Sequence, residues 1–515
     1  MLSWAKMPII HRVLLSVTDK TGLVDFARTL TGIGAELVST GGTARMIREA
    51  GIPVKDVAEV TGFPEMLDGR IKTLHPKIAA GILAMRARPA HMQALAEHQI
   101  APIDMLVVNL YRFEDVACRG DAPLAELIEN IDIGGPTMIR AAAKNYQDVA
   151  VVVSPEDYGP IAAELRAAAG ALSIETRWRL AKKAFRTTAD YDAAISARLE
   201  QVDSSGALPL DLALRAPKRM DLRYGENPHQ QAALYGKPGQ GVAGARQLHG
   251  KELSYNNLVD LDAAWQLALE FSAPAAAIIK HTNPCGCAEQ PALAEAYRKA
   301  FECDPVSAYG GVIGLNRTLD EETAREIAKT FIEAIAAPGY SPEALSILSA
   351  KKNLRLIEVA PGTDRLVVKS ISGGFLAQTI DNARLDRAAA LVKSARAPSE
   401  TEWTALEFAW KVAKHVKSNA IVYARGGQVV GVGAGQMSRV DSVKLGAMKA
   451  VLPLAGAVVA SDAFFPFPDG VEEAVKHGAT AFIQPGGSVR DAEVIAAADR
   501  LGVAMVFTGV RHFRH

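Results

Sequence analysis

Cysteine is scarce in this sequence: its 515 residues include only Cys118, Cys285, Cys287 and Cys303. Four thiols in a chain of this length do not form a disulfide framework, so the sequence predicts a reducing environment and a cytoplasmic location. Cys285 and Cys287 are spaced too tightly for the usual Cys-x-x-Cys zinc clip, and no second pair follows them. We therefore predict no metal site.

Long apolar runs, net charge and aromatic residues are also lacking. No stretch approaches the ~18 consecutive apolar residues that span a bilayer, and Lys6, His11 and Arg12 interrupt the first apolar segment, which is typical of a short leader to a strand. Lys and Arg together number 57, and so do Asp and Glu, so the chain lacks the basic excess that nucleic acid or an anionic membrane requires. Aromatic residues make up 6%, which argues against stacking platforms for single-stranded nucleic acid. Small anionic ligands need only a few cations and stay compatible with this balance.

Short apolar strands alternate with amphipathic helices from Arg12 to about Pro155. This pattern indicates an α/β fold with a doubly wound parallel sheet, whose ligands bind at the carboxyl ends of the strands. The expected strands are Val13–Val17, Glu36–Ser39, Met105–Leu110 and Val149–Val153, and the expected helices include Leu23–Leu30 and Thr43–Ala50.

A long helical pattern over Ser173–Leu199 and a connector over Asp203–Lys218 follow, and we place the main domain boundary near residue 215. The first domain is then 1–215, with an α/β core of about 12–155 and a helical linker of about 156–215, and the second is 216–515. The second domain mixes helices and strands. Its expected elements are helices Asp260–Phe271, Pro291–Phe301 and Glu321–Glu333, strands Ala275–Lys280 and Gly311–Leu315, and a hairpin of Ile421–Ala424 with Val429–Gly433.

Two loops of the first domain are suited to anions. Ser16–Gly22 and Ser39–Thr43 each place hydroxyls and backbone N–H groups at an expected helix start, where the helix dipole favours negative charge. Gly41 and Gly42 let the backbone approach a phosphate closely, and Lys20 supplies a point charge. The alternative is a pair of ordinary capped helix starts.

Further polar groups follow in the same domain. Asp68–Lys77 is either a structured basic loop facing an anionic ligand or a solvated charge run. Asn109 and Tyr111 come at the carboxyl end of an expected buried strand, where polar groups are more often functional than structural. Asp132 precedes a helix that carries Lys144, and it acts either in a site or only as a helix cap.

In the second domain an apolar strand ends in Lys280-His281, and Asn283 with Pro284 then favours a turn. A neighbouring cation disfavours the protonated form of a histidine, which suits a general base near neutral pH. Adjacent strand residues point to opposite faces, so only the turn brings both side chains into one site, and the alternative is an incidental polar pair. The aromatic run within Ser461–Asp469 forms either a wedge of core or a wall for a flat heteroaromatic ring.

The first half resembles the bifunctional purine-biosynthesis family that combines phosphoribosylaminoimidazolecarboxamide formyltransferase with IMP cyclohydrolase, through the runs LLSVTDKTGLVDFARTL, STGGTARMIREAGI, TGFPEMLDGRIKTLHPKIAAGIL, NLYRF and IDIGGPTMIRAAAKN. The second half extends the resemblance over essentially the whole chain, through DLRYGENPHQQAALY, GKELSYNNLVDLDAAW, KHTNPCG, CDPVSAYGG, VKSNAIVYA, VGVGAGQMSRVDS, SDAFFPFPDG and QPGGS. The resemblance implies a methylglyoxal-synthase-like fold with cyclohydrolase chemistry in the first half. It implies a cytidine-deaminase-like α/β fold without the zinc in the second half, with formyl transfer from 10-formyltetrahydrofolate.

The resemblance also implies site residues. In the cyclohydrolase, Lys144 would move a proton, Lys72 and Tyr111 would polarise and orient the formyl group, and Asp132 would hold the amide. In the formyltransferase, His281 would be the general base and Lys280 would stabilise the transition state. The implied nucleotide contacts of the cyclohydrolase are Thr18, Asp19, Lys20, Thr40, Gly41, Gly42, Thr43, Arg70, Thr73, Asn109 and Ile133. Those of the formyltransferase are Arg223, Tyr224, Gly310, Glu333, Asn419, Arg439 and Arg511 on the nucleotide side, and Val440, Phe464, Asp469, Gln484 and Pro485 on the folate side.

The expected partners are small-molecule nucleotide and folate substrates, without nucleic acid, membrane or a tightly bound cofactor. The resemblance further implies a homodimer with the transferase site at the subunit interface. The alternative function is that of a non-catalytic nucleotide-sensing protein, which would need phosphate loops but no paired acid–base groups. A nicotinamide dehydrogenase is excluded, because Gly-x-Gly-x-x-Gly does not follow the first strand.

Overall fold

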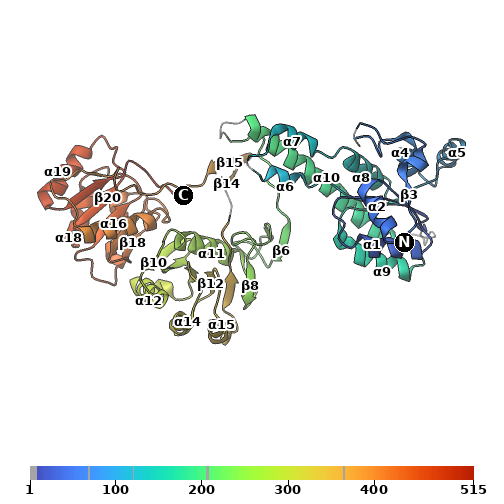
Figure 1. Cartoon of the computed structure of the whole chain (residues 1–515). Coiled ribbons are helices and arrows are strands. Elements are labelled where there is room, and N and C mark those ends of the chain that lie inside the picture. Colours follow the sequence, from blue (N-terminus) through green and yellow to red (C-terminus); the bar gives the residue numbers. More distant parts are fainter. Residues whose placement is uncertain (1–7, 68–69, 120, 204–207, 363–365) are drawn as a thin grey trace. The chain divides into compact units, whose positions relative to one another are not determined.

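The computed structural model describes residues 8–67, 70–119, 121–203, 208–362 and 366–515. The chain forms two compact units that divide between Ala213 and Leu214 (Figure 1). Asp68 and Gly69 of the expected basic loop, Gly206 of the expected connector and Lys6 of the expected leader lie outside the described residues. No helix within the described ranges is both long enough and apolar enough to cross a bilayer.

The N-terminal unit is built on a five-stranded sheet in the order β3-β2-β1-β4-β5, with every neighbouring pair parallel. Both faces are covered: Val13 and Leu15 of β1 belong to one core cluster, and Leu14 belongs to another. Burial on both faces explains why these strands are near-continuous apolar runs, as the sequence predicts. The strands are β1 (Arg12–Val17), β2 (Glu36–Ser39), β3 (Lys55–Asp56), β4 (Met105–Asn109) and β5 (Ala150–Val152).

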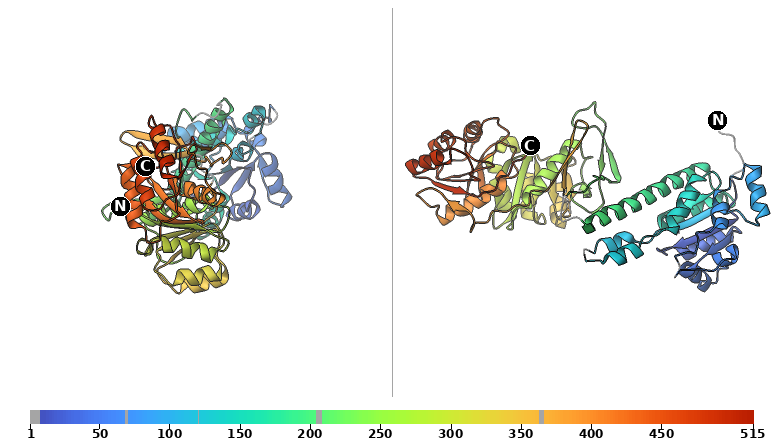
Figure 2. Two further views of the ribbon diagram at one scale, coloured as in Figure 1. Left: turned by 90° about the vertical axis from the view of Figure 1, so that its left-hand side faces the viewer. Right: turned by 90° about the horizontal axis from the view of Figure 1, so that it is seen from above.

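Helices surround this sheet, and the longest, α10, packs along α8 and β5; it is the long green helix in the right-hand view of Figure 2. They are α1 (Leu23–Gly32), α2 (Gly41–Glu49), α3 (Val57–Thr61), α4 (Pro76–Leu83), α5 (Pro89–Glu97), α6 (Phe113–Ala117), α7 (Leu124–Glu129), α8 (Gly134–Lys144), η1 (Pro155–Asp157), α9 (Tyr158–Ala167) and α10 (Ile174–Asp203).

The C-terminal unit is built on a twelve-stranded mixed sheet in the order β16-β21-β20-β19-β17-β18-β10-β9-β11-β12-β13-β8. The expected hairpin is confirmed, because β17 and β18 pair antiparallel across the Gly426-Gly427 turn. Two further two-stranded sheets, β6-β7 and β14-β15, stand apart from it. The strands are β6 (Lys218–Leu222), β7 (Ala232–Tyr235), β8 (Arg246–His249), β9 (Ala275–Lys280), β10 (Asn283–Glu289), β11 (Val312–Leu315), β12 (Ala334–Ala337), β13 (Arg355–Glu358), β14 (Leu366–Ile371), β15 (Gly374–Thr379), β16 (Leu391–Val392), β17 (Ile421–Arg425), β18 (Gln428–Gly433), β19 (Val458–Ser461), β20 (Ala481–Gln484) and β21 (Ala504–Phe507).

Two helix boundaries in this unit differ from the prediction. The helix expected to run to Glu333 ends at Ala328, because the fully buried run Ala334–Ala337 joins the sheet as β12. The helix expected from Asp260 begins at Tyr255, because Ser254 and Asn257 form a capping box. The helices are α11 (Tyr255–Ala268), α12 (Leu293–Cys303), α13 (Pro305–Ala308), α14 (Glu321–Ala328), α15 (Pro342–Ser349), α16 (Glu400–Ala413), α17 (Arg439–Lys449), α18 (Asp469–Lys476) and α19 (Asp491–Leu501).

Candidate active sites

The two loops predicted to bind anions lie side by side in the N-terminal unit, because they follow the neighbouring parallel strands β1 and β2. The Thr43 hydroxyl joins them: it accepts a hydrogen bond from the Val17 N–H at 3.1 Å and donates one to the Val17 carbonyl at 3.0 Å. Thr43 is buried, so its hydroxyl holds the two strand ends together. The Ser39 hydroxyl reinforces the same join by donating to the Leu15 carbonyl at 2.8 Å.

Two lysines converge on the glycine pair that begins α2. A Cβ atom added to Gly41 would lie 3.9 Å from the Lys72 Nζ, and one added to Gly42 would lie 3.8 Å from the Lys20 Nζ. Gly41 also has a φ of +55°, a backbone conformation that favours glycine. The Lys72 Nζ is 3.3 Å from a carboxylate oxygen of Glu65. The helix start therefore offers backbone N–H groups flanked by two ammonium groups, which suits a phosphate.

Asn109, the last residue of β4, shapes the first of these loops. Its Oδ1 accepts hydrogen bonds from the backbone N–H groups of Thr18 at 2.6 Å and Asp19 at 2.9 Å, and its Nδ2 donates to the Asp19 carbonyl at 2.9 Å. Hydrogen bonds from Thr21 and the charge of Arg112 lower the pKa of Asp19. Asp19 thus remains a carboxylate. Its backbone N–H bonds to Asn109 and its carboxylate to Thr21, and both contacts fix the loop.

Asp132 closes the site at the start of α8. Its Oδ1 accepts a hydrogen bond from the Gly135 N–H at 2.8 Å, and its own N–H donates to the Tyr191 hydroxyl at 2.8 Å. Burial raises the pKa of Asp132, and hydrogen bonds from the backbone of Gly135 and Tyr111 oppose that shift. The N-cap residue of α8 is Ile133, but the Asp132 carboxylate accepts from an N–H of the first helical turn and at the same time ties the Tyr111 segment to α8.

The remaining predicted residues of this unit fall into two groups. Thr73 is at the same edge, because its hydroxyl would lie 3.0 Å from a Cβ added to Gly134. The side chains of Tyr111 and Ile133 are exposed there, and Arg70 pairs with Glu129. Lys144 is instead the last residue of α8, about 15 Å along the helix axis from its start, and is exposed. Thr73, the neighbour of Lys72 in the sequence, thus lies against the start of α8, where Asp132 accepts a hydrogen bond from the Tyr111 backbone, whereas Lys144 is at the other end of this helix.

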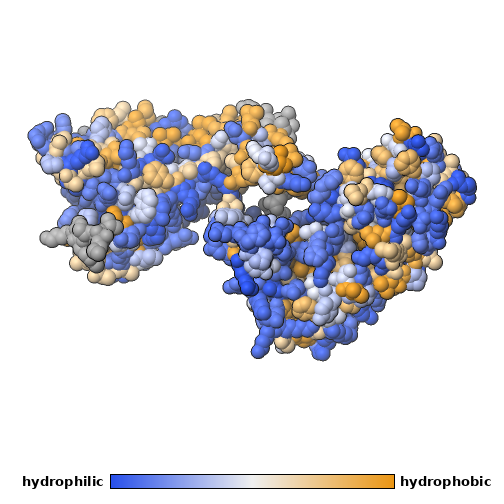
Figure 3. All heavy atoms as spheres, turned by 180° about the vertical axis from the view of Figure 1, so that it is seen from behind, coloured by the Kyte–Doolittle hydropathy of each residue, from blue (hydrophilic) through white to orange (hydrophobic). Residues whose placement is uncertain are grey.

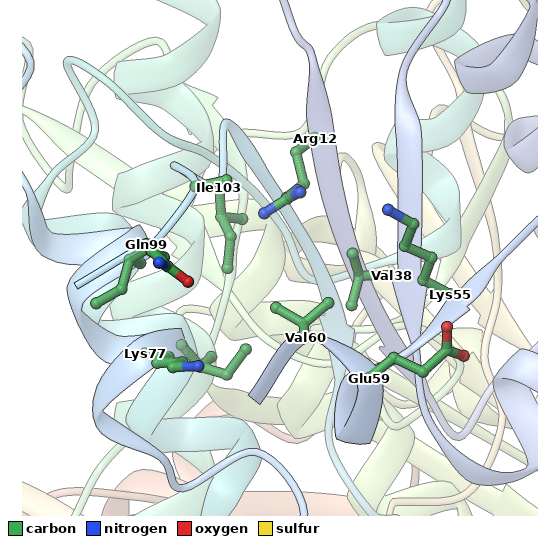
Figure 4. A pocket seen from close by; sticks show the side chains of 11 residues that line it. Arg12, Val38, Lys55, Glu59, Val60, Lys77, Gln99 and Ile103 are labelled. Atoms are coloured by element: carbon green, nitrogen blue, oxygen red, sulfur yellow. The ribbon is translucent and has the colours of Figure 1, made fainter. Parts of the chain in front are cut away.

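A cavity of about 280 Å³ in this unit lies apart from these loops. Figure 4 shows the Arg12 side chain above Val38 and Val60, and the Lys77 side chain at the lower left, below Gln99. It opens at the start of β1, whereas the predicted residues follow the ends of the strands, and it shares none of them. Arg12 forms an ion pair with Glu36 at 2.5 Å, and Lys55 on the cavity wall pairs with the same carboxylate. Because this carboxylate offsets the cations, we assign the cavity no ligand.

A turn joins β9 to β10 as expected, but it lies at His281-Thr282 rather than at Asn283-Pro284, because Asn283 and Pro284 pair with the end of β9 as the first residues of β10. His281 and Thr282 adopt φ values of +52° and +62°, and the Thr282 N–H donates to an Asp260 carboxylate oxygen at 2.7 Å. The Lys280 Nζ donates to the Tyr309 carbonyl at 2.8 Å and would lie 3.4 Å from a Cβ added to Gly310. The His281 side chain is exposed, and no hydrogen bond or ion pair joins its imidazole to another described residue. The imidazole is therefore available to a ligand.

A chain of polar contacts connects this turn to the next predicted residues. The Asn283 Oδ1 accepts a hydrogen bond from the Lys417 N–H at 3.0 Å. Two residues on, the Asn419 Oδ1 accepts one from Arg439 at 2.6 Å. Arg439 is buried and also donates to an Asp462 carboxylate oxygen at 2.6 Å. Asn419 and Arg439 thus lie together near the turn, with most of the Arg439 guanidinium engaged inside the protein.

The predicted folate-side residues differ in how far their side chains are exposed to solvent. Phe464 is partly exposed and adjoins the fully buried Phe465. Gln484 is also fully buried: its Oε1 accepts a hydrogen bond from the Phe465 N–H at 2.8 Å, and its Nε2 lies 3.3 Å from the Met505 sulfur. The buried Gln484 side chain therefore holds the Phe464 loop in place through the backbone of Phe465. Of the other three, Asp469 is exposed, Val440 is half-buried and Pro485 is buried.

The other predicted nucleotide contacts include Arg223, Tyr224 and Glu333, whose side chains contact different groups. Arg223 is exposed next to the Tyr224 ring, with its Cζ 5.6 Å from the ring centre. Glu333 forms an ion pair with Arg355 at 2.6 Å. No contact within the described ranges joins either Arg223 or Glu333 to the Lys280-His281 turn.

Sequence reasoning missed three residues that organise this site. Asp260 holds the turn, Tyr309 holds Lys280, and Asp462 holds Arg439. Tyr309 and Asp462 lie inside motifs that resemble the family, CDPVSAYGG and SDAFFPFPDG. Their positions were thus visible in the sequence, but their partners are about 20 to 30 residues away along the chain, and local patterns do not reveal such pairs.

Glu270 forms a second polar centre in this unit. Its carboxylate accepts hydrogen bonds from Lys414 at 2.8 Å and His415 at 3.0 Å. Burial would raise the pKa of Glu270, but these hydrogen bonds and charges outweigh it and lower the pKa from 4.5 to about 2.

We expect Glu270→Gln to lower the free energy of unfolding of the C-terminal unit by roughly 3 kcal/mol at pH 7. Because the folded-state pKa is the lowered one, this contribution is present above about pH 4.5 and disappears as the pH falls towards about 2. Urea unfolding at several pH values measures it, with the exposed Glu493→Gln as control. A difference that stays constant between pH 7 and pH 3 contradicts the prediction.

Comparison with known proteins assigns the chain to a family. The family model described as AICARFT/IMPCHase bienzyme matches residues 142–449, and the model of the MGS-like domain matches residues 22–137. A solved structure described as "Crystal structure of ForH" is 34% identical and covers 37% of this chain and 99% of its own, with a TM-score of 0.34. The first family model matches more than half of the sequence. The chain therefore belongs to the AICARFT/IMPCHase bienzyme family.

Membership establishes the class of fold and the activities. The chain has an MGS-like domain in its N-terminal part and an AICARFT/IMPCHase region after it, within a mixed α/β fold that contains parallel sheets. It is an enzyme with formyltransferase and IMP cyclohydrolase activities, which are the last two steps of IMP synthesis. The family is folate-dependent, and its substrates are small molecules. The alternative of a non-catalytic nucleotide sensor receives no support from these matches.

Proposed function

We propose that each unit carries one of the two activities. The C-terminal unit transfers a formyl group from 10-formyltetrahydrofolate to the exocyclic amine of the aminoimidazolecarboxamide ribonucleotide, and the N-terminal unit closes the formylated product to IMP. The observation that carries the first assignment is the exposed imidazole of His281 at the β9–β10 turn, which directly follows Lys280 and has no hydrogen-bond or ion-pair partner among the described residues. The observation that carries the second is the pair of lysines, Lys20 and Lys72, over Gly41-Gly42.

In the C-terminal unit, His281 acts as a general base. An aromatic amine is a weak nucleophile, so His281 removes its proton as the new C–N bond forms at the formyl carbon. The bond between that carbon and the folate nitrogen then breaks, and the nitrogen takes up a proton. Lys280, held at the Tyr309 carbonyl, supplies positive charge near the tetrahedral oxygen and the leaving nitrogen.

In the N-terminal unit, the carboxamide nitrogen attacks the formyl carbon of the same molecule and water leaves. Lys72 and Tyr111 polarise the formyl oxygen, and Asp132 holds the amide. Lys20 and the N–H groups at the start of α2 bind the phosphate. The family resemblance implies that Lys144, at the far end of α8, moves the proton.

The co-substrate is 10-formyltetrahydrofolate, and we propose no tightly bound cofactor and no nucleic acid partner. Hydrophilic and apolar side chains are mixed over the face shown in Figure 3, in keeping with 57 basic and 57 acidic residues. The cations proposed to act on substrates are thus local, and long-range steering contributes little. All four cysteines are free thiols, which supports a reducing compartment and our proposal of the cytoplasm.

The test follows both steps on one protein. The chain is incubated with the aminoimidazolecarboxamide ribonucleotide and 10-formyltetrahydrofolate, and the formylated nucleotide and IMP are quantified by chromatography. In a second reaction, pre-formylated nucleotide is supplied without folate. We expect IMP in both reactions, and formylated nucleotide in the second to decline as IMP rises. Failure of one reaction alone rejects the assignment for that unit only.

We also propose that the enzyme is a homodimer, and the hairpin of β14 and β15 supports this. In the part of the chain that the structure describes, the two strands pair only with each other, and Phe375 and Leu376 are 59% and 58% exposed. An isolated hairpin is marginally stable in water, so packing against a second copy accounts for its apolar surface.

Phe375→Asp together with Leu376→Asp is expected to convert the dimer to a monomer, because charged residues are costly to bury in an apolar interface. Sedimentation equilibrium at micromolar concentration measures the mass, and Lys352→Asp, at an exposed position outside the hairpin, is the matched charge control. A monomeric wild-type protein would refute the homodimer, and a dimeric double variant would refute the role of the hairpin.

A further inference from the structure

We propose that residues 508–515 form a positioning segment of the formyltransferase site, with His512 and Arg514 as its two anchors. The segment holds the predicted folate-side and nucleotide-side loops in one arrangement and presents Arg511 just before the first anchor. This inference rests on the function proposed for the C-terminal unit. It adds two positioning residues to that site.

The backbone of the segment connects three separate loops. The N–H groups of Thr508 and Gly509 donate to the carbonyls of Gln484 at 2.9 Å and Pro485 at 3.0 Å. The His512 N–H then donates to the Asp462 carbonyl at 3.0 Å, beside the Phe464 loop.

The third loop carries Asn419. The Arg514 carbonyl accepts a hydrogen bond from the Ser418 N–H at 3.0 Å. Residues 484–485, 461–464 and 417–419 are thus joined by one short stretch of chain, although they are far apart in the sequence.

His512 is the first anchor. Its side chain is 2% exposed, its ring centre lies 5.1 Å from that of Trp410, and its Nδ1 is 2.5 Å from an Asp381 carboxylate oxygen. A buried imidazole held by both a ring contact and a carboxylate has little freedom to shift. The backbone at this point of the segment is therefore fixed.

Arg514 is the second anchor. Its guanidinium lies 2.9 Å from the His415 Nδ1, and the His415 Nε2 lies 3.0 Å from a Glu270 carboxylate oxygen. Because a guanidinium only donates, Nδ1 must accept, and Nε2 carries the proton that His415 donates to Glu270. His415 is four residues before Asn419. Arg514 therefore holds the Asn419 loop twice, through its guanidinium at His415 and through its carbonyl at Ser418.

Arg511 lies just before the first anchor and is exposed, with its Cζ 4.3 Å from the centre of the Phe513 ring. Neither anchor touches the Lys280-His281 turn within the described ranges. Loss of an anchor should therefore weaken binding of the nucleotide, through Arg511 and Asn419, and leave the proton transfer by His281 largely intact. Such a change raises KM more than it lowers kcat.

The experiment compares Arg514→Ala, Arg514→Lys and Asp381→Asn in the full chain, with the exposed Arg500→Ala as matched control. We expect Arg514→Ala to raise the KM for the nucleotide about tenfold and to change kcat less than about threefold, because a charge-assisted hydrogen bond is lost. Arg514→Lys keeps a hydrogen-bond donor, so its KM for the nucleotide should lie between those of the wild type and Arg514→Ala. Asp381→Asn should raise the KM less, and Arg500→Ala should not change it.

Cyclisation of pre-formylated nucleotide is measured on the same preparations and should be unchanged. If the KM stays at the wild-type value in both Arg514→Ala and Asp381→Asn, the positioning role is overturned. If Arg514→Ala unfolds the unit, as circular dichroism would show, Arg514→Lys and Asp381→Asn decide in the same way. A wild-type chain that forms no formylated nucleotide refutes the proposed function itself, whereas an active wild type with unchanged variants refutes only the positioning segment.

Discussion

His281→Ala is expected to lower the kcat of formyl transfer by about 10²- to 10⁴-fold, the range that a general base contributes. The imidazole is exposed at a turn and has no partner among the described residues, so its loss should leave the rest of the site in place. Formylated nucleotide is quantified over time at saturating concentrations of both substrates. Cyclisation of pre-formylated nucleotide by the same variant should proceed at the wild-type rate.

The backbone at this position calls for a second variant. His281 has a φ of +52°, and alanine is less tolerant of this region than asparagine. His281→Asn therefore serves as the matched control for backbone strain, since it keeps the turn and removes the base. Both variants should be equally inactive. Near wild-type activity in His281→Asn would show that the turn matters and that the imidazole does not.

Lys72→Ala is expected to slow cyclisation by about 10²- to 10³-fold, the effect of removing one donor to a developing oxyanion. The Lys72 Nζ lies over Gly41 and near Glu65, so the change removes positive charge from the loop that faces the substrate. IMP formation from pre-formylated nucleotide is followed by absorbance. Formyl transfer should not change, and a cyclisation rate within twofold of wild type would contradict the role.

Lys144→Ala is the companion measurement. Sequence resemblance implies a loss of cyclisation as large as that of Lys72→Ala, whereas the position of Lys144 at the end of α8 separates it from Asp132. A normal rate in Lys144→Ala would show that a group other than Lys144 moves the proton. A large loss, with formyl transfer intact, would uphold the sequence prediction.

The sequence predicted much of the fold because its signals there are local. The short apolar strands and the glycines that follow them predicted the order of elements in the N-terminal unit. Asn283-Pro284 indicated a turn after β9, but His281-Thr282 form that turn and Asn283-Pro284 begin β10. The helix expected to run to Glu333 was too long, because burial of β12 in the sheet depends on strands distant in sequence.

The sequence predicted which segments contribute to the candidate sites better than it predicted what each side chain contacts. Gln484 and Arg439 fall in recognisable motifs, yet the structure buries both and directs them to protein partners. Those partners, Phe465 and Asp462, are about 20 residues away, and single-sequence patterns carry no signal for such pairs. Lys144 is a similar case: helical periodicity predicts which face of α8 carries it, but it does not predict the distance of Lys144 from residues on other elements.

Asn109 has a further consequence for how the N-terminal unit recognises its ligand. Its amide makes three hydrogen bonds to the backbone of Thr18 and Asp19, so this loop is ordered when the protein folds. A preorganised loop loses little conformational entropy when a nucleotide arrives, and more of the interaction energy then appears as affinity. Selectivity in such a loop comes from rejecting ligands that do not fit a rigid shape, rather than from the loop adapting to them.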